Sequence, residues 1–235
     1  MGRATVFACM VAALSVSLAG VAHAQPLPTT APEDRTLPTI ARLHYGGGGD
    51  WYGNPSSLPN LLKQIAHDTH IPVADREAVV TIESPDLRDY PYLYMTGHGN
   101  VHFTDEELRI LRAYLISGGF LHADDNYGMD KSFRREMKRL FPDRPLVPVP
   151  LDHPIYHIVH DFPDGLPKVH EHDGLPAQGL GIFYDGRLVV FYSYQSDLGD
   201  GWEDPEVHGD PAAIRKAARE MGVNLFAYAL SQPKP

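Results

Sequence analysis

The pattern of apolar and polar residues predicts a β-α-β unit in the middle of the chain. Residues 92–96 (YLYMT) form a short apolar and aromatic run, as expected of a strand that is buried on both faces. Thr104 and Glu107 then have the spacing of a capping box, and apolar residues recur at helical intervals after them. Two glycines at 118–119 end this helix, and residues 120–123 (FLHA) predict the next strand. The unit indicates an α/β fold with a mainly parallel sheet.

The same reasoning predicts further elements on both sides of this unit. Asp185-Gly186 separates two apolar runs and predicts a β-hairpin, because this dipeptide accepts positive φ angles. A final helix is expected to begin with Asp210 as its cap and Pro211 at its first position. The other expected strands are 40–45, 78–82, 181–184 and 188–192, and the other expected helices are 58–65 and the basic amphipathic segment 132–140.

The amino-terminal segment has the pattern of a signal peptide. Arg3 precedes an apolar run over 6–21, and an A-x-A pattern ends at Ala24. We expect cleavage after Ala24, an extended leader rich in Pro and Thr over 25–38, and a single domain over 39–232. The protein is then exported, either periplasmic or secreted, with no membrane span after cleavage. An uncleaved amino-terminal anchor is the alternative.

The charge balance and the single cysteine exclude several classes of function. The chain has 20 Lys and Arg against 30 Asp and Glu, a formal net charge of −10, which loss of Arg3 would change to −11. Nucleic acid is not an expected partner, because no basic cluster is available to replace its counterions. Cys9 lies within the predicted signal peptide. The mature protein would therefore have no disulfide, no thiolate metal ligand and no cysteine nucleophile.

Polar residues follow the two central strands where each of them ends. Thr96 and His98 close the first strand, and Asp124 and Asp125 close the second, followed by Asn126. Because a crossover helix makes the strands parallel, these residues are expected at one edge of the sheet, where α/β proteins bind ligands. We predict catalytic roles for His98, Asp124 and Asp125. The alternative is that the carboxylates only cap a helix and that the histidine bonds to the backbone.

A glycine-rich loop after the first predicted strand adds candidates for ligand binding. Four glycines at 46–49 allow close approach of the backbone, but the loop lacks the ending of a P-loop, so a ligand-facing loop and a tight turn both stay open. Trp51, Tyr52 and Trp202, if exposed, would stack on apolar sugar faces. The ligand-binding candidates are Gly47, Gly48, Asp50, Trp51, Tyr52, Thr96, Asn126 and Trp202.

Two later segments suggest metal binding without matching a motif of fixed spacing. His170 and His172, followed by Asp173, offer zinc ligands. The acidic segment 197–204, with Asp197, Asp200, Glu203 and Asp204, offers oxygen ligands for calcium. The metal-ligand candidates are His98, Asp125, His153, His170 and His172. A divalent metal, zinc or calcium, and the absence of any cofactor remain equal alternatives.

Five segments carry a resemblance to a known family. They are RLHYGGGGDWY (42–52), YMTGHGNVHFTDEE (94–107), LISGGFLHADDNYG (115–128), DHPIYH (152–157) and DLGDGWEDPEV (197–207). In these segments the chain resembles the bacterial family catalogued as domain of unknown function 4159, over roughly residues 40–230. That family is placed in the class I glutamine amidotransferase-like superfamily, so the resemblance implies a flavodoxin-like three-layer α/β/α sandwich. GGFLHADD, HPIYH and the hairpin DGRLVVFYSY are more distantly similar to trehalose-utilisation-like proteins.

The chain departs from that superfamily at the catalytic position. Amidotransferases of the superfamily use a cysteine on a strand-to-helix turn, and the mature chain would have none. Glutaminase chemistry is therefore excluded, and no G-x-S-x-G motif offers a serine instead. Three hypotheses remain. The first is a hydrolase-like enzyme, with or without a metal. The second is a noncatalytic module that binds a small molecule or a glycan. The third is a scaffold with protein partners that the sequence does not name.

Overall fold

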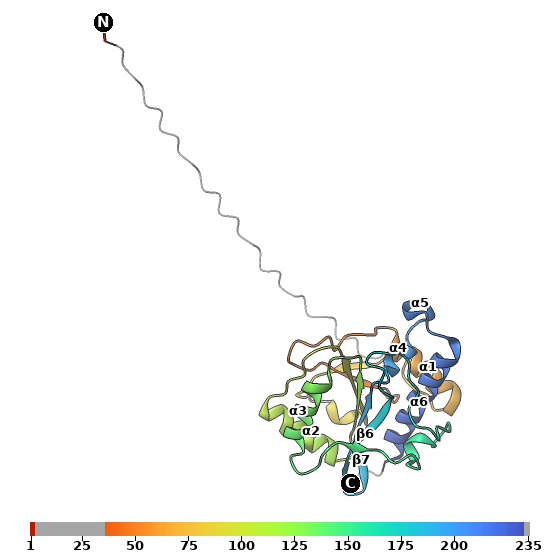
Figure 1. Cartoon of the computed structure of the whole chain (residues 1–235). Coiled ribbons are helices and arrows are strands. Elements are labelled where there is room, and N and C mark those ends of the chain that lie inside the picture. The colour runs from red at the N-terminus through yellow and green to blue at the C-terminus, as the bar shows by residue number, and fades with distance from the viewer. Residues whose placement is uncertain (3–35, 233–235) are drawn as a thin grey trace.

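A seven-stranded sheet runs through the described part of the protein, which comprises residues 1–2 and 36–232 of the computed structural model (Figure 1). Residues 3–24 of the predicted signal peptide and residues 25–35 of the predicted leader lie outside the described residues. Five neighbouring strands are parallel: β2 (Ala78–Val80), β1 (Ala41–Leu43), β3 (Tyr92–Gly97), β4 (Phe120–Asp125) and β7 (Arg187–Tyr194). Next to β7, the sheet ends with the antiparallel neighbours β6 (Gln178–Tyr184) and β5 (Val147–Pro148).

Helices cover both faces of this sheet (Figure 1). On one face lie α2 (Asp105–Ile116) and α3 (Asp130–Leu140), and on the other lie α1 (Ser57–Thr69) and α6 (Ala212–Ser231). Four short helices complete the fold: η1 (Leu87–Asp89), η2 (Pro154–Tyr156), α4 (Leu198–Trp202) and α5 (Pro205–His208). The architecture is the predicted flavodoxin-like three-layer α/β/α sandwich. Among the described residues, no helix combines the length and apolar character required to cross a membrane.

The two faces of β3 show why the central strands are continuously apolar. Leu93 and Met95 belong to the core beneath α2 and α3, whereas Tyr92 and Tyr94 belong to the core beneath α1 and α6. All four side chains are fully buried, because successive residues of a strand point to opposite faces and both faces are covered. The prediction of a strand buried on both faces is confirmed.

The predicted cap of α2 is confirmed, whereas the predicted cap of α6 is wrong. At the start of α2, the Thr104 hydroxyl accepts from the Glu107 amide at 3.1 Å and the Glu107 carboxylate accepts from the Thr104 amide at 2.7 Å. Asp210 does not cap α6, which begins at Ala212 without a side-chain cap. Its carboxylate instead lies 3.2 Å from Nε2 of His170.

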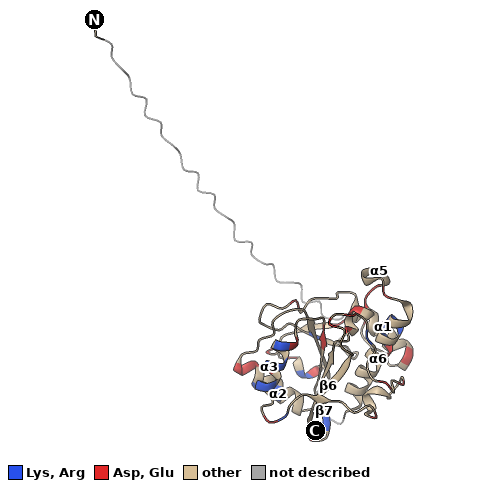
Figure 2. Cartoon of the chain, in the orientation of Figure 1, with Lys and Arg blue, Asp and Glu red and all other residues tan. Residues whose placement is uncertain are grey.

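The basic residues of α3 lie on the outer face of the helix, as expected. Some short elements of the fold were not predicted. The basic side chains of this helix are exposed or partly exposed, and they give the helix its blue segments in Figure 2. The helix starts at Asp130, two residues before the predicted start. The sequence did not predict β5, α4 or α5, which are too short to show a periodic pattern.

A buried arginine of β1 holds the loop that follows the strand. Arg42, 3% exposed, donates to the carbonyl of Gly53 at 2.7 Å and to that of Asn54 at 3.2 Å. Its Nε lies 3.4 Å from a carboxylate oxygen of Glu77. The guanidinium therefore satisfies carbonyls of a partly buried loop.

We expect Arg42→Met to lower the free energy of unfolding by about 1–3 kcal/mol, because it leaves partly buried acceptors and the Glu77 carboxylate without their partner. Urea denaturation measures the change. Arg76→Met is the control, since Arg76 is 46% exposed and pairs only with its neighbour Asp75. Equal stability of the two variants would contradict a structural role for Arg42.

Candidate functional site

The carboxyl ends of β3, β4 and β7 meet at one edge of the sheet. In the strand register, Thr96 pairs with Asp124, Gly97 pairs with Asp125, and Asp124 pairs with Ser193. The predicted proximity of Thr96 to the two carboxylates of β4 is therefore confirmed. What each side chain does at this edge depends on its burial and on its hydrogen bonds.

Asp124 is a fully buried hydrogen-bond acceptor. Its Oδ1 accepts from the Ser193 hydroxyl at 2.5 Å and from the Leu198 amide at 3.2 Å. Its Oδ2 accepts from the Gly199 amide at 2.6 Å and lies 3.5 Å from the Tyr94 hydroxyl. Burial raises the pKa of Asp124 to about 8, although the donors from Ser193 and Gly199 act in the opposite direction. These donors enclose the carboxylate, so Asp124 ties the loop after β7 to the end of β4. The catalytic role predicted for Asp124 stays a prediction.

A chain of buried polar groups extends from Asp124 along the sheet. The Ser193 hydroxyl lies 2.9 Å from Nε2 of His122, and Nδ1 of His122 lies 2.8 Å from the Tyr92 hydroxyl. Because Ser193 donates to Asp124, we assign the His122 proton to Nε2, which leaves Nδ1 to accept from Tyr92. Burial lowers the pKa of His122 to about 3, so the imidazole is neutral at physiological pH. The sequence analysis did not single out His122, because nothing in an apolar strand marks a histidine as part of a network.

The neighbouring polar candidates are also buried. Asp125 is 1% exposed, its Oδ1 has no hydrogen-bond partner among the described residues, and burial raises its pKa. The Thr96 hydroxyl donates to Asn126 at 3.1 Å, and the Asn126 amide donates to Asn54 at 3.3 Å. Thr96 and Asn126 therefore brace the loops at this edge and are less than 3% exposed.

The glycine-rich loop packs against its own chain at one glycine and is open at the next. A Cβ on Gly47 would lie 2.6 Å from the carbonyl of Asn100, so glycine is needed there for close packing of two loops. A Cβ on Gly48 would meet nothing within 4 Å. The tight-turn interpretation thus accounts for Gly47, whereas Gly48 faces open space.

Asp50 and His98 form an exposed pair at the same edge. The Asp50 carboxylate accepts from the His98 amide at 2.5 Å and lies 2.8 Å from Nδ1 of the His98 ring. Burial tends to raise the pKa of Asp50, but these bonds to His98 outweigh it and hold the pKa below its ordinary value. The His98 side chain is 62% exposed. Asp50 therefore orients a histidine whose other nitrogen, Nε2, is free of any partner among the described residues.

The three aromatic candidates do not form one platform. Trp51 stacks on His44 with ring centroids 4.1 Å apart, and Tyr52 is 59% exposed beside it. Trp202 is fully buried, and its Nε1 donates to the Ala218 carbonyl at 2.8 Å. The prediction of an exposed, ligand-stacking Trp202 is wrong, because this side chain anchors α4 in the core.

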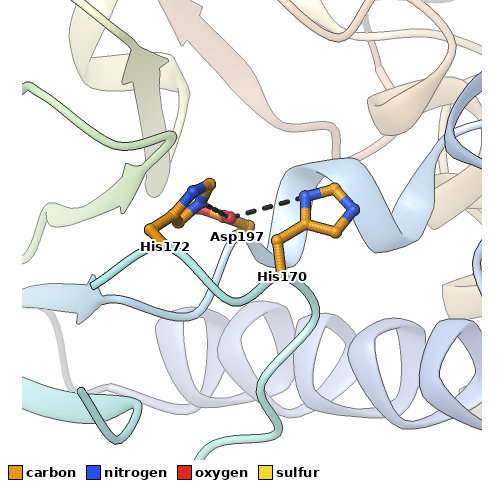
Figure 3. A group of neighbouring side chains, drawn as sticks. All are labelled: His170, His172 and Asp197. Atoms are coloured by element: carbon orange, nitrogen blue, oxygen red, sulfur yellow. Dashed lines mark hydrogen bonds and ion pairs between the residues drawn. The ribbon is translucent and has the colours of Figure 1, made fainter. Parts of the chain in front are cut away.

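A cluster of histidines and carboxylates follows the end of β7. The Val169 amide donates to the Ser196 carbonyl at 2.9 Å, which lays the segment before His170 alongside the loop after β7. In Figure 3 the rings of His170 and His172 approach the Asp197 carboxylate from two sides. Nδ1 of His170 lies 3.5 Å from Oδ2 of Asp197, and Nε2 of His172 contacts the same oxygen. These three residues form the first group with the spacing of metal ligands.

Asp197 is the most constrained member of this group. Its backbone is left-handed, with φ 57° and ψ 45°, a conformation that costs a non-glycine residue free energy and often marks a functional position. The side chain is 1% exposed, and Oδ1 has no hydrogen-bond partner among the described residues. Burial, followed by the nearby charge of Asp200, raises the pKa of Asp197 to about 8. An unpartnered carboxylate oxygen beside two imidazoles is the arrangement that a bound cation would complete.

A second group shares His170. Its Nδ1 lies 3.0 Å from Oδ2 of Asp200, and Nε2 of His208 lies 3.8 Å from Oδ1 of Asp200. These residues also have the spacing of metal ligands. Asp200 is held in place by Asn54, whose amide donates to Oδ1 at 2.6 Å.

Histidines in both groups favour a zinc-type metal over calcium, which takes oxygen ligands. The predicted calcium ligands do not converge. Asp197 and Asp200 face histidines, Glu203 accepts from the Ser56 hydroxyl at 3.2 Å, and Asp204 accepts from Asn60 at 2.9 Å.

The structure brings together only part of the predicted metal set. His170 and His172 meet, whereas His98, Asp125 and His153 belong to neither group among the described residues. His153 packs on Phe183, which pairs with Leu188 near the start of β7, at the opposite edge of the sheet. Asp173 accepts from the Tyr127 hydroxyl at 2.7 Å instead of joining the histidines. The sequence analysis did not connect Asp197, Asp200 and His208 with His170 and His172. The two sets of residues lie in different loops, which are distant from each other along the chain.

We expect Asp124→Asn to destabilise the protein by about 1–3 kcal/mol, because its side-chain nitrogen replaces one acceptor oxygen and leaves the amide of either Leu198 or Gly199 without an acceptor. Urea denaturation followed by Trp202 fluorescence measures it. Asp164→Asn, at an exposed position, is the matched control. Asp124→Asn with unchanged stability would show that this carboxylate does not hold the loop.

His122 is expected to make the fold sensitive to acid. Its folded pKa of about 3 lies below its unfolded value of 6.5, so its stabilising effect is present above pH 6.5 and is lost as the pH falls toward 3. In His122→Phe this part of the pH slope, at most about 1.4 kcal/mol per pH unit, should disappear. Urea denaturation between pH 4 and 7 tests this, with Tyr92→Phe as a control that keeps the imidazole. Identical slopes in wild type and His122→Phe would refute the assignment.

Comparison with known proteins places the chain in a family but attaches no activity to it. No curated protein matches the sequence. The family model described as a domain of unknown function, DUF4159, matches residues 39–230, which comprise nearly all of the described domain. The chain therefore belongs to the DUF4159 family.

Proposed function

We propose that the protein is an exported, metal-dependent hydrolase whose active site lies at the carboxyl ends of β4 and β7. The observation that carries the proposal is the buried Asp197 carboxylate, which faces His170 and His172 with one oxygen and has no partner for the other. Two histidines and one carboxylate are a ligand set that catalytic zinc sites use, with a further position left for water or substrate. The predicted signal peptide supports export, and the order of the parallel strands supports a relation to the amidotransferase-like superfamily without its glutaminase chemistry.

In this proposal, different residues bind the metal and transfer the proton. His170, His172 and Asp197 would hold a zinc-type ion, which supplies a Lewis acid and a water molecule that ionises near neutral pH. Tyr127 stacks on His172 with ring centroids 4.6 Å apart and fixes the orientation of that ring. Asp50 orients His98 for proton transfer, since a carboxylate on Nδ1 leaves Nε2 to exchange a proton with solvent or substrate.

The exposed aromatic residues favour a carbohydrate-containing substrate. Tyr52 and Tyr127 are 59% and 45% exposed and lie in the loops that follow β1 and β4. Tyrosine rings in such positions stack on the apolar faces of sugars. The same observation supports the second candidate function, a noncatalytic module that binds an envelope glycan.

Metal analysis of the purified protein tests the proposal first. We expect stoichiometric zinc-type metal and a melting temperature that chelator lowers. Asp197→Asn should have two opposite effects. It should stabilise the metal-free protein by replacing a buried carboxylate whose Oδ1 has no partner among the described residues, and it should abolish the stabilisation by added metal. His153→Ala is the control and should keep the metal. Absence of metal binding in the wild type would overturn the proposal.

Activity separates the two candidate functions. A screen of esters, amides and glycosides of envelope sugars should reveal a reaction that His172→Ala removes. Glycan binding by a metal-loaded protein that hydrolyses none of these substrates would instead establish the noncatalytic module.

A further inference from the structure

A pocket lined by basic residues lies apart from the histidine and carboxylate cluster, between α1 and α6. It is open to solvent and has a volume of about 450 Å³. Lys63 and His67 line it from α1, and Arg215 and Arg219 line it from α6. One acidic residue, Asp204, also lines it, and its carboxylate accepts from the Asn60 amide at 2.9 Å. The chain as a whole is acidic, with a formal net charge of −10, so this concentration of positive charge is local.

The spacing of these residues works against helix stability. Each helix places two basic residues four positions apart, so that they lie on adjacent turns of the same face. A like-charged pair at this spacing, such as Arg215 and Arg219, destabilises a helix. Residues of both helices line the same pocket. An arrangement that is unfavourable within the protein becomes favourable when an anion binds between the helices.

The acidic residues nearby leave part of this charge uncompensated. Lys63 and Arg219 make no hydrogen bond or ion pair with any described residue. His67 is 2.7 Å from its neighbour Asp68, and Arg215 donates to the Glu203 carbonyl at 2.7 Å, which fixes the guanidinium at the pocket wall. Partial burial, followed by the charge of Arg215, lowers the pKa of Arg219.

We propose that this pocket binds a small anionic ligand that carries phosphate or sulfate groups. Guanidinium groups bind the oxygens of these anions with two parallel hydrogen bonds, and a lysine adds a mobile positive charge. The volume accommodates an anion with more than one such group. This site is independent of the proposed metal centre, since none of its basic residues belongs to either group of metal ligands.

A second basic pocket shows what a compensated arrangement looks like. It lies beside α3, has a volume of about 360 Å³ and is lined by Arg134, Lys138 and Arg144. Nε of Arg134 is 2.6 Å from Asp130, and the Arg144 guanidinium lies 4.7 Å from the centre of the Tyr184 ring. Its arginines are thus already engaged by protein groups, so Arg134 provides a matched control.

Titration calorimetry with inorganic pyrophosphate tests the proposal. The experiment uses the purified protein at a constant ionic strength set with sodium chloride, so that general screening is the same throughout. We expect saturable binding that is weakened about tenfold or more in Lys63→Gln/Arg219→Gln and is unchanged in Arg134→Gln. A parallel titration with sulfate shows which of the two oxyanions the site prefers.

The outcomes separate this site from the metal centre. Pyrophosphate that binds the double variant as tightly as the wild type would overturn the proposal and place the anion elsewhere, for example on a metal ion. Absence of saturable binding to both pyrophosphate and sulfate would also overturn it. Circular dichroism checks that the double variant is folded, and the single charge reversal Lys63→Glu, at an exposed position, provides a second test with the same expected loss of affinity.

Discussion

The hydrogen bonding of one buried carboxylate, Asp124, connects the centre of the sheet to the candidate site. A carboxyl group is costly to bury unless hydrogen-bond partners surround it, and Asp124 accepts from Ser193 on β7 and from the amides of Leu198 and Gly199. The two amides belong to the start of α4, directly after Asp197. The end of β4 therefore fixes the path of the chain after β7. A substitution at Asp124 would therefore displace the candidate metal-ligating residues, although Asp124 itself would not contact a bound metal.

The candidate site is notable for acceptors that lack donors. Four buried oxygens without a hydrogen-bond partner among the described residues come from Asp125, Gln195, Asp197 and Asp210. Asp210 contacts His170, and the charges of Asp125 and Asp210 both act on Asp197. Unsatisfied buried acceptors are rare in folded proteins because each costs free energy of desolvation. A cation satisfies several acceptors at once, which is why the geometry favours a metal centre over a purely structural cluster.

Tight packing fixes α4 beside the candidate site. Trp202 fixes α4 in the core, and the hypothetical Cβ of Gly201 would lie only 2.5 Å from Ala218, so α4 packs tightly on α6. Tyr52 and His98 lie in exposed loops at the same edge of the sheet. In the proposed hydrolase, the scaffold would position the metal ligands and these loops would contact the substrate.

The sequence by itself determined the layers of the fold and the edge of the sheet that carries the site. The spacing of apolar residues and the helix-capping residues are local properties of the sequence, so β3, α2 and β4 could be predicted from residues 92–125. Because the two strands are parallel, Thr96 then lies beside Asp124. Only the tertiary structure decided which polar residues are buried and which meet. The local sequence around Asp124 and Trp202 does not distinguish a buried aspartate or tryptophan from an exposed one. In the folded protein both side chains are fully buried. His170 and Asp197 meet because two loops lie side by side, and local sequence patterns contain no information about contacts between segments that are distant in the chain.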